Sequence, residues 1–285
     1  MSGPILETKN LIKAFGGLVA VDNVDIAIET GRITAIIGPN GAGKTSLFNL
    51  IAGVYRPTSG DIIFNGNSLR YAPWYAKAVP PQMKQHKLFK NRLHHHAPAH
   101  KRTALGIART FQHVNLFGNM TVLENIMTGQ HPRSKYGFFA AALRLPKARH
   151  EEEMINLNAM KYLNMVGLGK HADQKSLSLP LGQQKLLAIA RALATEPKLI
   201  LLDEPGAGLN ALEKRELSEL IRRIRDMGIT VVLVEHDMPL VMGIAEWIIV
   251  LDSGMKIAEG TAAQVQKDKK VIAAYLGEET DDAED

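Results

Sequence analysis

Residues 38–45 carry the pattern with the clearest chemical consequence, reading GPNGAGKT between an apolar run at Ile33–Ile37 and a segment of helical spacing. Glycines at this spacing let backbone N–H groups converge on phosphate oxygens, and a helix N-terminus favours an anion. A lysine then adds a cation for the β and γ phosphates, and a threonine hydroxyl offers a ligand to Mg²⁺. The alternative, an ordinary tight turn with an exposed lysine, does not require this order of strand, turn and helix. We predict an ATP phosphate site formed by Gly38, Pro39, Asn40, Gly41, Ala42, Gly43, Lys44, Thr45 and Ser46.

A second candidate site lies where four apolar residues, 199–202, end in two adjacent carboxylates, Asp203 and Glu204. Successive strand residues point to opposite sides, so the two acids are expected to have different roles. We predict that Asp203 organises the Mg²⁺ shell and that Glu204 orients or deprotonates an attacking water. By itself such an acidic pair could equally be solvent-exposed surface charge. The phosphate-binding pattern earlier in the chain makes a role in catalysis the specific interpretation.

The strands and helices that must position these residues are predicted from the spacing of apolar residues and from the glycines and prolines between them. The pattern predicts a mixed α/β core with antiparallel strands at the start and a helical insertion near the middle. The expected strands are residues 5–13, 19–28, 33–37, 60–66, 199–202 and 229–234, and the expected helices follow Lys44 and cover 155–168, 183–195 and 211–225.

With these motifs in order, the sequence resembles an ABC ATPase, a P-loop family with further ordered motifs. Residues 109–112 resemble its glutamine loop, 179–184 its signature, 208–210 its dimer-contacting loop and 234–237 its switch. The resemblance implies that Gln112 reaches Mg²⁺ and the attacking water and that His236 contacts the γ-phosphate. It also implies that Gly182 and Gln183 bind ATP held by the P-loop of a second ATPase subunit. Taken alone, His236 fits a structural histidine.

The resemblance further assigns adenine stacking to Phe15, backed by Val21; the alternative is that Phe15 is a strand core residue. One departure concerns the signature, where the family usually has Ser and Gly and this chain has Pro180 and Leu181. A hydroxyl contact to the partner's γ-phosphate is therefore missing. This departure favours a heterodimer of ATPases over a homodimer.

Three stretches, 15–21, 110–117 and 235–238, look like the larger ATPase of branched-chain amino-acid importers, and the ending 274–278 is similar. Such importers combine two ATPases, two membrane permease subunits and an extracytoplasmic substrate-binding protein. The resemblance thus implies an ATP-hydrolysing subunit that energises import of leucine, isoleucine and valine. ATPases of urea or amide importers and of the lipopolysaccharide exporter are near neighbours and stay open as alternatives.

Composition limits the remaining classes. Residues 1–285 are expected to form one ATPase domain, with a helical subdomain at about 113–185. The chain has no cysteine, no apolar secretory run at its start and no membrane-spanning stretch, so we expect a peripheral position at the cytoplasmic face of the cell membrane.

A net charge of +5 would suit nucleic acid, as in ABC ATPases of translation and repair. Those usually carry two ATPase domains or a long coiled coil, so no nucleic acid partner is expected. A regulatory module without turnover is disfavoured by the intact acidic pair.

Charge is concentrated in two segments. Residues 71–102 hold seven Lys or Arg, five His and no Asp or Glu, and residues 278–285 hold six acids. The basic segment reads as a solvated insertion, or alternatively as a surface for anionic lipid headgroups. Its histidines meet no metal-ligand spacing rule. The acidic tail reads as a solvated end.

Overall fold

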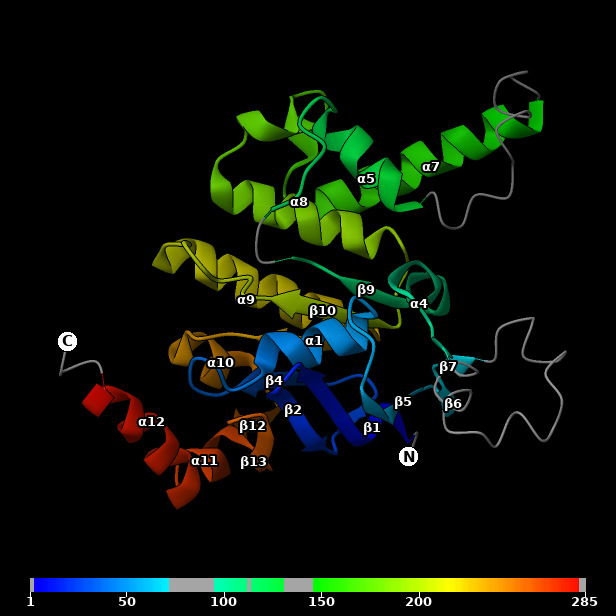
Figure 1. The fold of residues 1–285 in the computed structure, drawn as a ribbon. Helices are drawn as coiled ribbons and strands as arrows, with labels where there is room; N and C mark the ends of the chain where they lie inside the picture. The colour runs from blue at the N-terminus through cyan, green and yellow to red at the C-terminus, as the bar shows by residue number, and fades with distance from the viewer. Residues whose placement is uncertain (1–2, 72–94, 112–113, 131–145, 282–285) are drawn as a thin grey trace, which may run out of the picture. The chain divides into compact units, whose positions relative to one another are not determined.

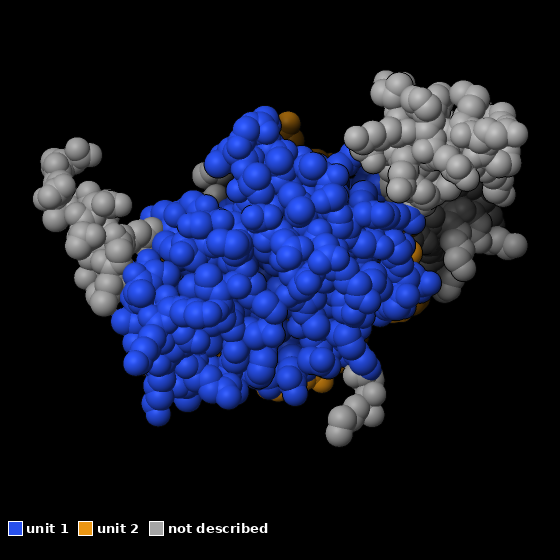
Figure 2. All heavy atoms as spheres, turned by 60° about the horizontal axis from the view of Figure 1, so that its bottom comes forward, with its two compact units in different colours: residues 1–102, 246–285 blue, residues 103–245 orange. Residues whose placement is uncertain are grey.

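The computed structural model describes residues 3–71, 95–111, 114–130 and 146–281 (Figure 1). The chain divides into two units (Figure 2), of which unit 1 comprises residues 1–102 and 246–285, and unit 2 comprises residues 103–245.

Unit 1 begins with the antiparallel sheet that the alternating apolar residues predict. β1 (Pro4–Phe15) pairs antiparallel with β2 (Leu18–Val24), with β3 (Ala27–Glu29) and with β5 (Ser59–Phe64), and β5 forms a hairpin with β6 (Asn67–Ser68). The predicted antiparallel region is confirmed, except that the expected strand 19–28 is interrupted at residues 25–26 and the expected strand 60–66 ends at Phe64.

The second set of strands in unit 1 positions the glycine-rich turn. β4 (Ile33–Ile37) pairs parallel with β12 (Trp247–Asp252), which pairs antiparallel with β13 (Met255–Gly260), so this sheet is mixed. Every residue of β4 is buried, which explains its uninterrupted run of apolar side chains. The turn leads into α1 (Lys44–Ala52), and the chain ends with α11 (Ala262–Val265) and α12 (Lys269–Asp281). The backbone of α12 thus includes the start of the acidic tail, and residues 282–285 lie outside the described residues.

Most of the basic segment, residues 72–94, lies outside the described residues. At its two ends β7 (Arg70–Tyr71) pairs antiparallel with β8 (His95–His96), and α4 (Ala99–Leu105) follows. Arg102 is completely buried, and its guanidinium donates hydrogen bonds to the carbonyl oxygens of Leu50, Ile51 and Ala97. Burial lowers the pKa of Arg102 to about 10. The expectation of a solvated segment is therefore wrong for Arg102, whose charge faces the C-terminal carbonyls of α1.

Unit 2 contains three parallel strands that place the acidic pair. β10 (Leu199–Asp203) lies between β9 (Ile107–Arg109) and β11 (Thr230–Val234), and every residue of β10 and β11 is buried. α9 (Ala211–Asp226) follows β10 and starts with a capping box, in which Asn210 accepts from the amides of Leu212 and Glu213. α10 (Met238–Ile244) follows β11.

The remaining helices of unit 2 pack on one another. α5 (Val122–Gln130) contacts both α7 (Pro146–Met165) and α8 (Leu181–Leu193), and α7 contacts α8; two 3₁₀ turns, Gly169–His171 and Ser176–Ser178, join α7 to α8. α7 begins at Pro146, whereas the sequence predicted a start at residue 155. The prediction missed the first turns because they are polar and lack apolar spacing. Among the described residues, each helix is too short or too polar to cross a bilayer.

Candidate functional site

The glycine-rich turn of unit 1 leaves β4 and enters α1 with a backbone that glycine alone tolerates at two positions. Gly38 has φ 151° and Gly43 has φ 92°. A Cβ atom at Gly38 would collide with the carbonyl oxygen of Leu251, and one at Gly43 with that of Ala20. Gly41, with φ 76°, has no atom within 4 Å of its Cβ position. The turn is therefore built from closely packed backbone rather than from side chains.

Lys44 is buried at the start of α1, and its ammonium donates hydrogen bonds to the carbonyl oxygens of Gly38 and Pro39, each at 2.6 Å. Thr45, one residue on, is exposed. The first amides of a helix have no partner within the helix, so those of α1 are directed at the turn. Backbone amides, a lysine and an exposed hydroxyl are the donor set that a nucleotide phosphate with Mg²⁺ requires.

The predicted adenine contact lies at the hairpin that joins β1 to β2. Phe15 is 42% exposed and forms an edge-to-face contact with Tyr55, with ring centroids 5.2 Å apart. The ammonium of Lys13 lies 4.5 Å from the centre of the Phe15 ring. Val21 is fully buried, so its side chain packs in the core of unit 1. Phe15 thus presents the aromatic surface, and Tyr55 and Lys13 hold it.

In unit 2, Asp203 at the end of β10 forms a buried ion pair. The Nη2 atom of Arg109 donates a hydrogen bond of 2.7 Å to Oδ2 of Asp203, and both side chains are less than a tenth exposed. Arg109 ends β9, the parallel neighbour of β10. Sequence reasoning assigned Arg109 no role of its own, although the carboxyl ends of neighbouring parallel strands lie together.

Glu204 leaves β10 with φ 45°, a left-handed conformation that is uncommon for a residue with a side chain. Its carboxylate Oε1 lies 3.1 Å from Nε2 of His236, which follows β11. A His236 that carries its proton on Nε2 donates it to this oxygen. The structure thus brings together two residues that the sequence separates, and an acid and an imidazole in contact can handle a proton.

Two further charged groups surround this pair. Lys185 on α8 is buried and donates to the carbonyl oxygens of Glu204 and Pro205, at 3.1 and 3.2 Å, and to that of Ala207 at 2.5 Å. Burial lowers the pKa of Lys185, and the nearby carboxylates of Glu235 and Glu204 oppose that shift. Burial also raises the pKa of Glu235, against the hydrogen bonds that its carboxylate accepts from backbone amides. No local sequence signal marks Lys185 or Glu235 as a functional residue.

The signature segment starts α8, with Pro180 at the N-cap position. Gly182 is buried beside α9, and a Cβ atom there would collide with the carboxylate of Glu213. Leu181, the residue that departs from the usual pattern, is 51% exposed. Gln183 is partly buried. Gln112, predicted to reach Mg²⁺ and water, lies outside the described residues.

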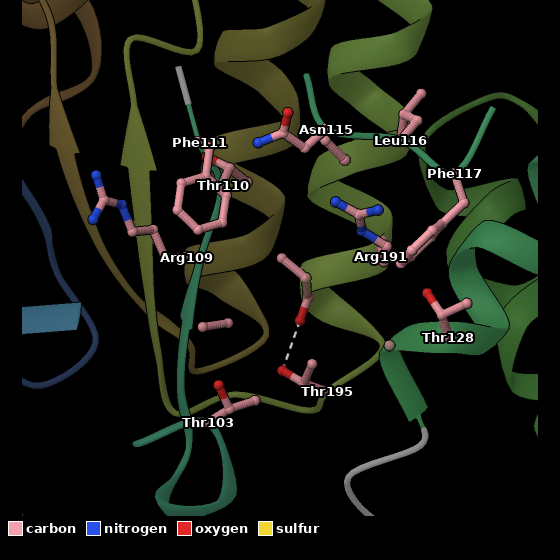
Figure 3. Close-up of a pocket in the computed structure, with 14 residues that line it drawn as sticks. Thr103, Arg109, Thr110, Phe111, Asn115, Leu116, Phe117, Thr128, Arg191 and Thr195 are labelled. Atoms are coloured by element: carbon pink, nitrogen blue, oxygen red, sulfur yellow. Dashed lines mark hydrogen bonds between the residues drawn. The ribbon is translucent and has the colours of Figure 1, made fainter. Parts of the chain in front are cut away.

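A pocket of about 510 Å³ opens beside the segment that follows β9 (Figure 3). Phe111 and Phe117 are 48% and 52% exposed, and the guanidinium carbon of Arg191 lies 5.6 Å from the centre of the Phe117 ring. The residues that line it are Thr103, Ala108, Arg109, Thr110, Phe111, Asn115, Leu116, Phe117, Thr128, Gly129, Ala188, Arg191, Ala192 and Thr195, with no acid among these described residues. The pocket is cationic, aromatic and rich in hydroxyls.

The fold and the glycine-rich turn define a P-loop nucleotide-binding protein. Residues 21–207 match the family model described as ABC transporter, and residues 255–281 match one described as branched-chain amino acid ATP-binding cassette transporter. The high-affinity branched-chain amino acid transport ATP-binding protein LivG of Escherichia coli is 40% identical, over 98% of this chain and 100% of its own length. The corresponding protein BraF of Pseudomonas aeruginosa is 39% identical over the same shares.

Solved structures agree with this assignment. An ATP-binding cassette of an ABC transporter in its ADP conformation aligns with a TM-score of 0.76 and 31% identity, over 96% of this chain and 99% of that one. A dimeric cassette bound to ADP and phosphate in a post-hydrolysis state aligns with a TM-score of 0.69 and 26% identity, over 90% and 98%. The chain belongs to the ABC transporter family, as an ATPase of the type found in branched-chain amino-acid transport. The fold class and the family resemblance predicted from the sequence are confirmed.

Proposed function

We propose that this chain hydrolyses ATP to drive import of leucine, isoleucine and valine, at the cytoplasmic face of the cell membrane. The observation that carries the chemistry is the contact of 3.1 Å between Glu204 and His236 at the ends of β10 and β11. The observation that carries the cargo is full-length similarity to LivG, at 40% identity.

In the proposed reaction Glu204 orients the attacking water and accepts its proton, because its carboxylate is held at the strand end by a neighbouring imidazole. His236 holds Glu204 in place and reaches the γ-phosphate. The P-loop amides and Lys44 neutralise the β and γ phosphates. Gln112 keeps its predicted role beside the water.

Mg²⁺ would be held by Thr45, Asp203 and Gln112, since hydroxyl, carboxylate and amide oxygens are the hard ligands that this ion prefers. When bound it supplies positive charge to the phosphate oxygens. The ion pair with Arg109 keeps the buried Asp203 carboxylate compensated.

The active assembly in this proposal contains two ATPase subunits, two membrane permease subunits and an extracytoplasmic binding protein. Gly182 and Gln183 bind the ATP on the P-loop of the second ATPase, and the exposed Leu181 faces that subunit. A short helix of a permease occupies the pocket beside Phe111 and Phe117. Arg109 is already paired with Asp203, so Arg191 is the cation that favours a permease helix presenting a carboxylate.

The test is ATPase activity of the chain assembled with its permease subunits in vesicles, with binding protein added on the outer side. We expect leucine-loaded binding protein to stimulate hydrolysis and urea-loaded binding protein to leave it unchanged. Stimulation by urea alone would assign the chain to the urea-type importers and would refute the proposed cargo.

Nucleotide binding is tested separately with Lys44→Ala. We expect this variant to lose ATP affinity, because the β and γ phosphates lose their side-chain cation. Lys161→Ala, on the exposed face of α7, is the matched control and should bind ATP normally. Equal affinity of Lys44→Ala and wild type would contradict the predicted phosphate site.

A further inference from the structure

The loop after β10, residues 204–207, starts in a conformation that needs support. Glu204 has φ 45°, and left-handed backbone in a residue with a Cβ atom costs free energy unless its surroundings impose it. The amide of Glu204 donates to the carbonyl oxygen of Val234 at 2.9 Å, which fixes one end of the loop. The orientation of the Glu204 side chain depends on what holds the rest.

Lys185 holds the carbonyl side of this loop. Its ammonium donates to the three carbonyl oxygens of Glu204, Pro205 and Ala207. An ammonium has three N–H donors, so these contacts use its full capacity. The side chain is 8% exposed, and water therefore does not readily substitute for it.

Glu235 holds the amide side of the same loop. Its Oε1 atom accepts a hydrogen bond from the amide of Gly206, and its Oε2 atom accepts one of 3.2 Å from the amide of His236. A Cβ atom at Gly206 would lie 2.9 Å from Oε1 of Glu235, so glycine permits this approach. Glu235 is 2% exposed. One carboxylate thus fixes both the loop that carries Glu204 and the backbone of its imidazole partner.

We propose that Lys185 and Glu235 are a pair of positioning residues that fix Glu204 for water activation. The inference rests on the proposed role of Glu204. Lys185 lies on α8 three positions after Gly182, so the same helix carries the signature and holds the catalytic loop. A shift of α8 moves the loop carbonyls with it. Lys185 therefore couples the signature of this chain to its own Glu204, and Glu235 fixes the loop from the other side.

The experiment uses the full chain assembled with its permease subunits. Lys185→Met removes the charge at nearly constant volume, and Glu235→Gln keeps an acceptor for one amide while it removes the charge. We expect each variant to lose about 100-fold in kcat, because small displacements of a catalytic group cost this much. The KM for ATP should stay within about twofold, because the P-loop is untouched. The double variant Lys185→Met/Glu235→Gln should have a kcat no lower than that of the less active single variant, because the two residues act as a unit.

Leu187→Ala separates a merely structural role, because Leu187 is a fully buried residue of α8 whose aliphatic side chain cannot form a hydrogen bond to the loop. If the two variants have the same thermal unfolding midpoint, Leu187→Ala should keep the wild-type kcat, whereas Lys185→Met should show the reduced kcat. Equal losses, or kcat within about twofold of wild type in both charge variants, would overturn the inference. If Lys185→Met does not fold, Glu235→Gln carries the same test.

Glu204→Gln in the same assay distinguishes the two proposals. An inactive Glu204→Gln with normal Lys185→Met and Glu235→Gln overturns the positioning pair alone. A Glu204→Gln variant of normal rate overturns the role of Glu204 and the inference that depends on it.

Discussion

The P-loop of unit 1 and the charged cluster of unit 2, which comprises Arg109, Lys185, Asp203, Glu204, Glu235 and His236, are built in opposite ways. The P-loop consists of consecutive residues whose backbone amides form the phosphate site. Lys44 donates hydrogen bonds to the carbonyl oxygens of Gly38 and Pro39 in the same turn. The cluster consists of side chains from four separate elements. Arg109, Lys185, Glu204 and His236 come from β9, α8 and the ends of β10 and β11. A contiguous motif can be recognised along the chain, whereas a cluster needs the fold to bring its parts together.

This difference predicts where chemistry and binding separate. Glu204→Gln should lower the rate of ATP hydrolysis about 10²- to 10⁴-fold, because the amide cannot accept the proton of the attacking water. ATP affinity should be unchanged, because the substitution leaves the P-loop residues that bind the phosphates intact. Single-turnover hydrolysis and equilibrium binding of labelled ATP measure the two quantities. A variant that loses affinity and keeps its rate per bound ATP would reverse the assignment.

The ion pair inside the cluster should matter most for stability. Arg109→Met leaves the carboxylate of Asp203 buried without its cation, and we expect the free energy of unfolding to fall by about 3–5 kcal/mol. Arg215→Met, an exposed arginine of α9, should change it by less than about 0.5 kcal/mol. Denaturant titration of the isolated chain measures both.

A second substitution sharpens this prediction. Asp203→Asn combined with Arg109→Met should recover part of the loss, because the remaining buried group is no longer charged. A double variant as unstable as the sum of the two single variants would show that Arg109 and Asp203 do not stabilise each other.

The P-loop should instead be sensitive to a single methyl group placed against its backbone. Gly38→Ala would set a Cβ atom against the carbonyl oxygen of Leu251, whereas Gly41→Ala meets no atom within 4 Å. Both residues have positive φ, so both variants carry a backbone cost of roughly 1–2 kcal/mol. Gly38→Ala should be destabilised by roughly 1–3 kcal/mol more, through overpacking. Equal unfolding midpoints of the two variants would refute the close approach.

The sequence predicted most strands and helices, because their signals are local. β4 occupies Ile33–Ile37 as expected, and α9 and β11 differ from the predicted bounds by a residue. α7 was predicted too short, since the polar turns after Pro146 show no apolar spacing. Arg102 was assigned to a solvated segment, because only the fold brings the carbonyl oxygens of Leu50 and Ile51 to its guanidinium.

The candidate site divides in the same manner. Glu204 and His236 were predicted from motifs, and their contact is visible in the structure. Arg109 and Glu235 lay within the quoted motifs and Lys185 in the expected helix after the signature, and none of the three received a role. A charge acquires its function from partners that are distant in sequence. Nothing in the local pattern distinguishes the buried Lys185 from an exposed lysine of an amphipathic helix.

A partly exposed ion pair next to the cluster gives the smallest expected effect. Asp237 follows His236 and caps α10 by accepting from the amide of Leu240, and it also accepts a hydrogen bond from Lys214. The hydrogen bond from Lys214 lowers the pKa of Asp237 below its usual 3.8. A carboxyl with a lowered pKa in the folded protein contributes stability above its unfolded pKa, and that contribution is lost as the pH falls through the folded pKa.

Asp237→Asn keeps a side-chain oxygen for the amide of Leu240 and removes only the charge. At pH 7 we expect a loss of roughly 0.5–1 kcal/mol, because both side chains are partly solvated and salt screens the pair. Wild type and variant should converge as the pH falls below 3.8, where the wild-type carboxylate becomes protonated. Denaturant unfolding from pH 7 down to the acid limit of the fold measures this difference, with the exposed Asp173→Asn as control. A difference that grows toward acid pH would contradict the ion pair with Lys214 and would leave the cap as the whole role of Asp237.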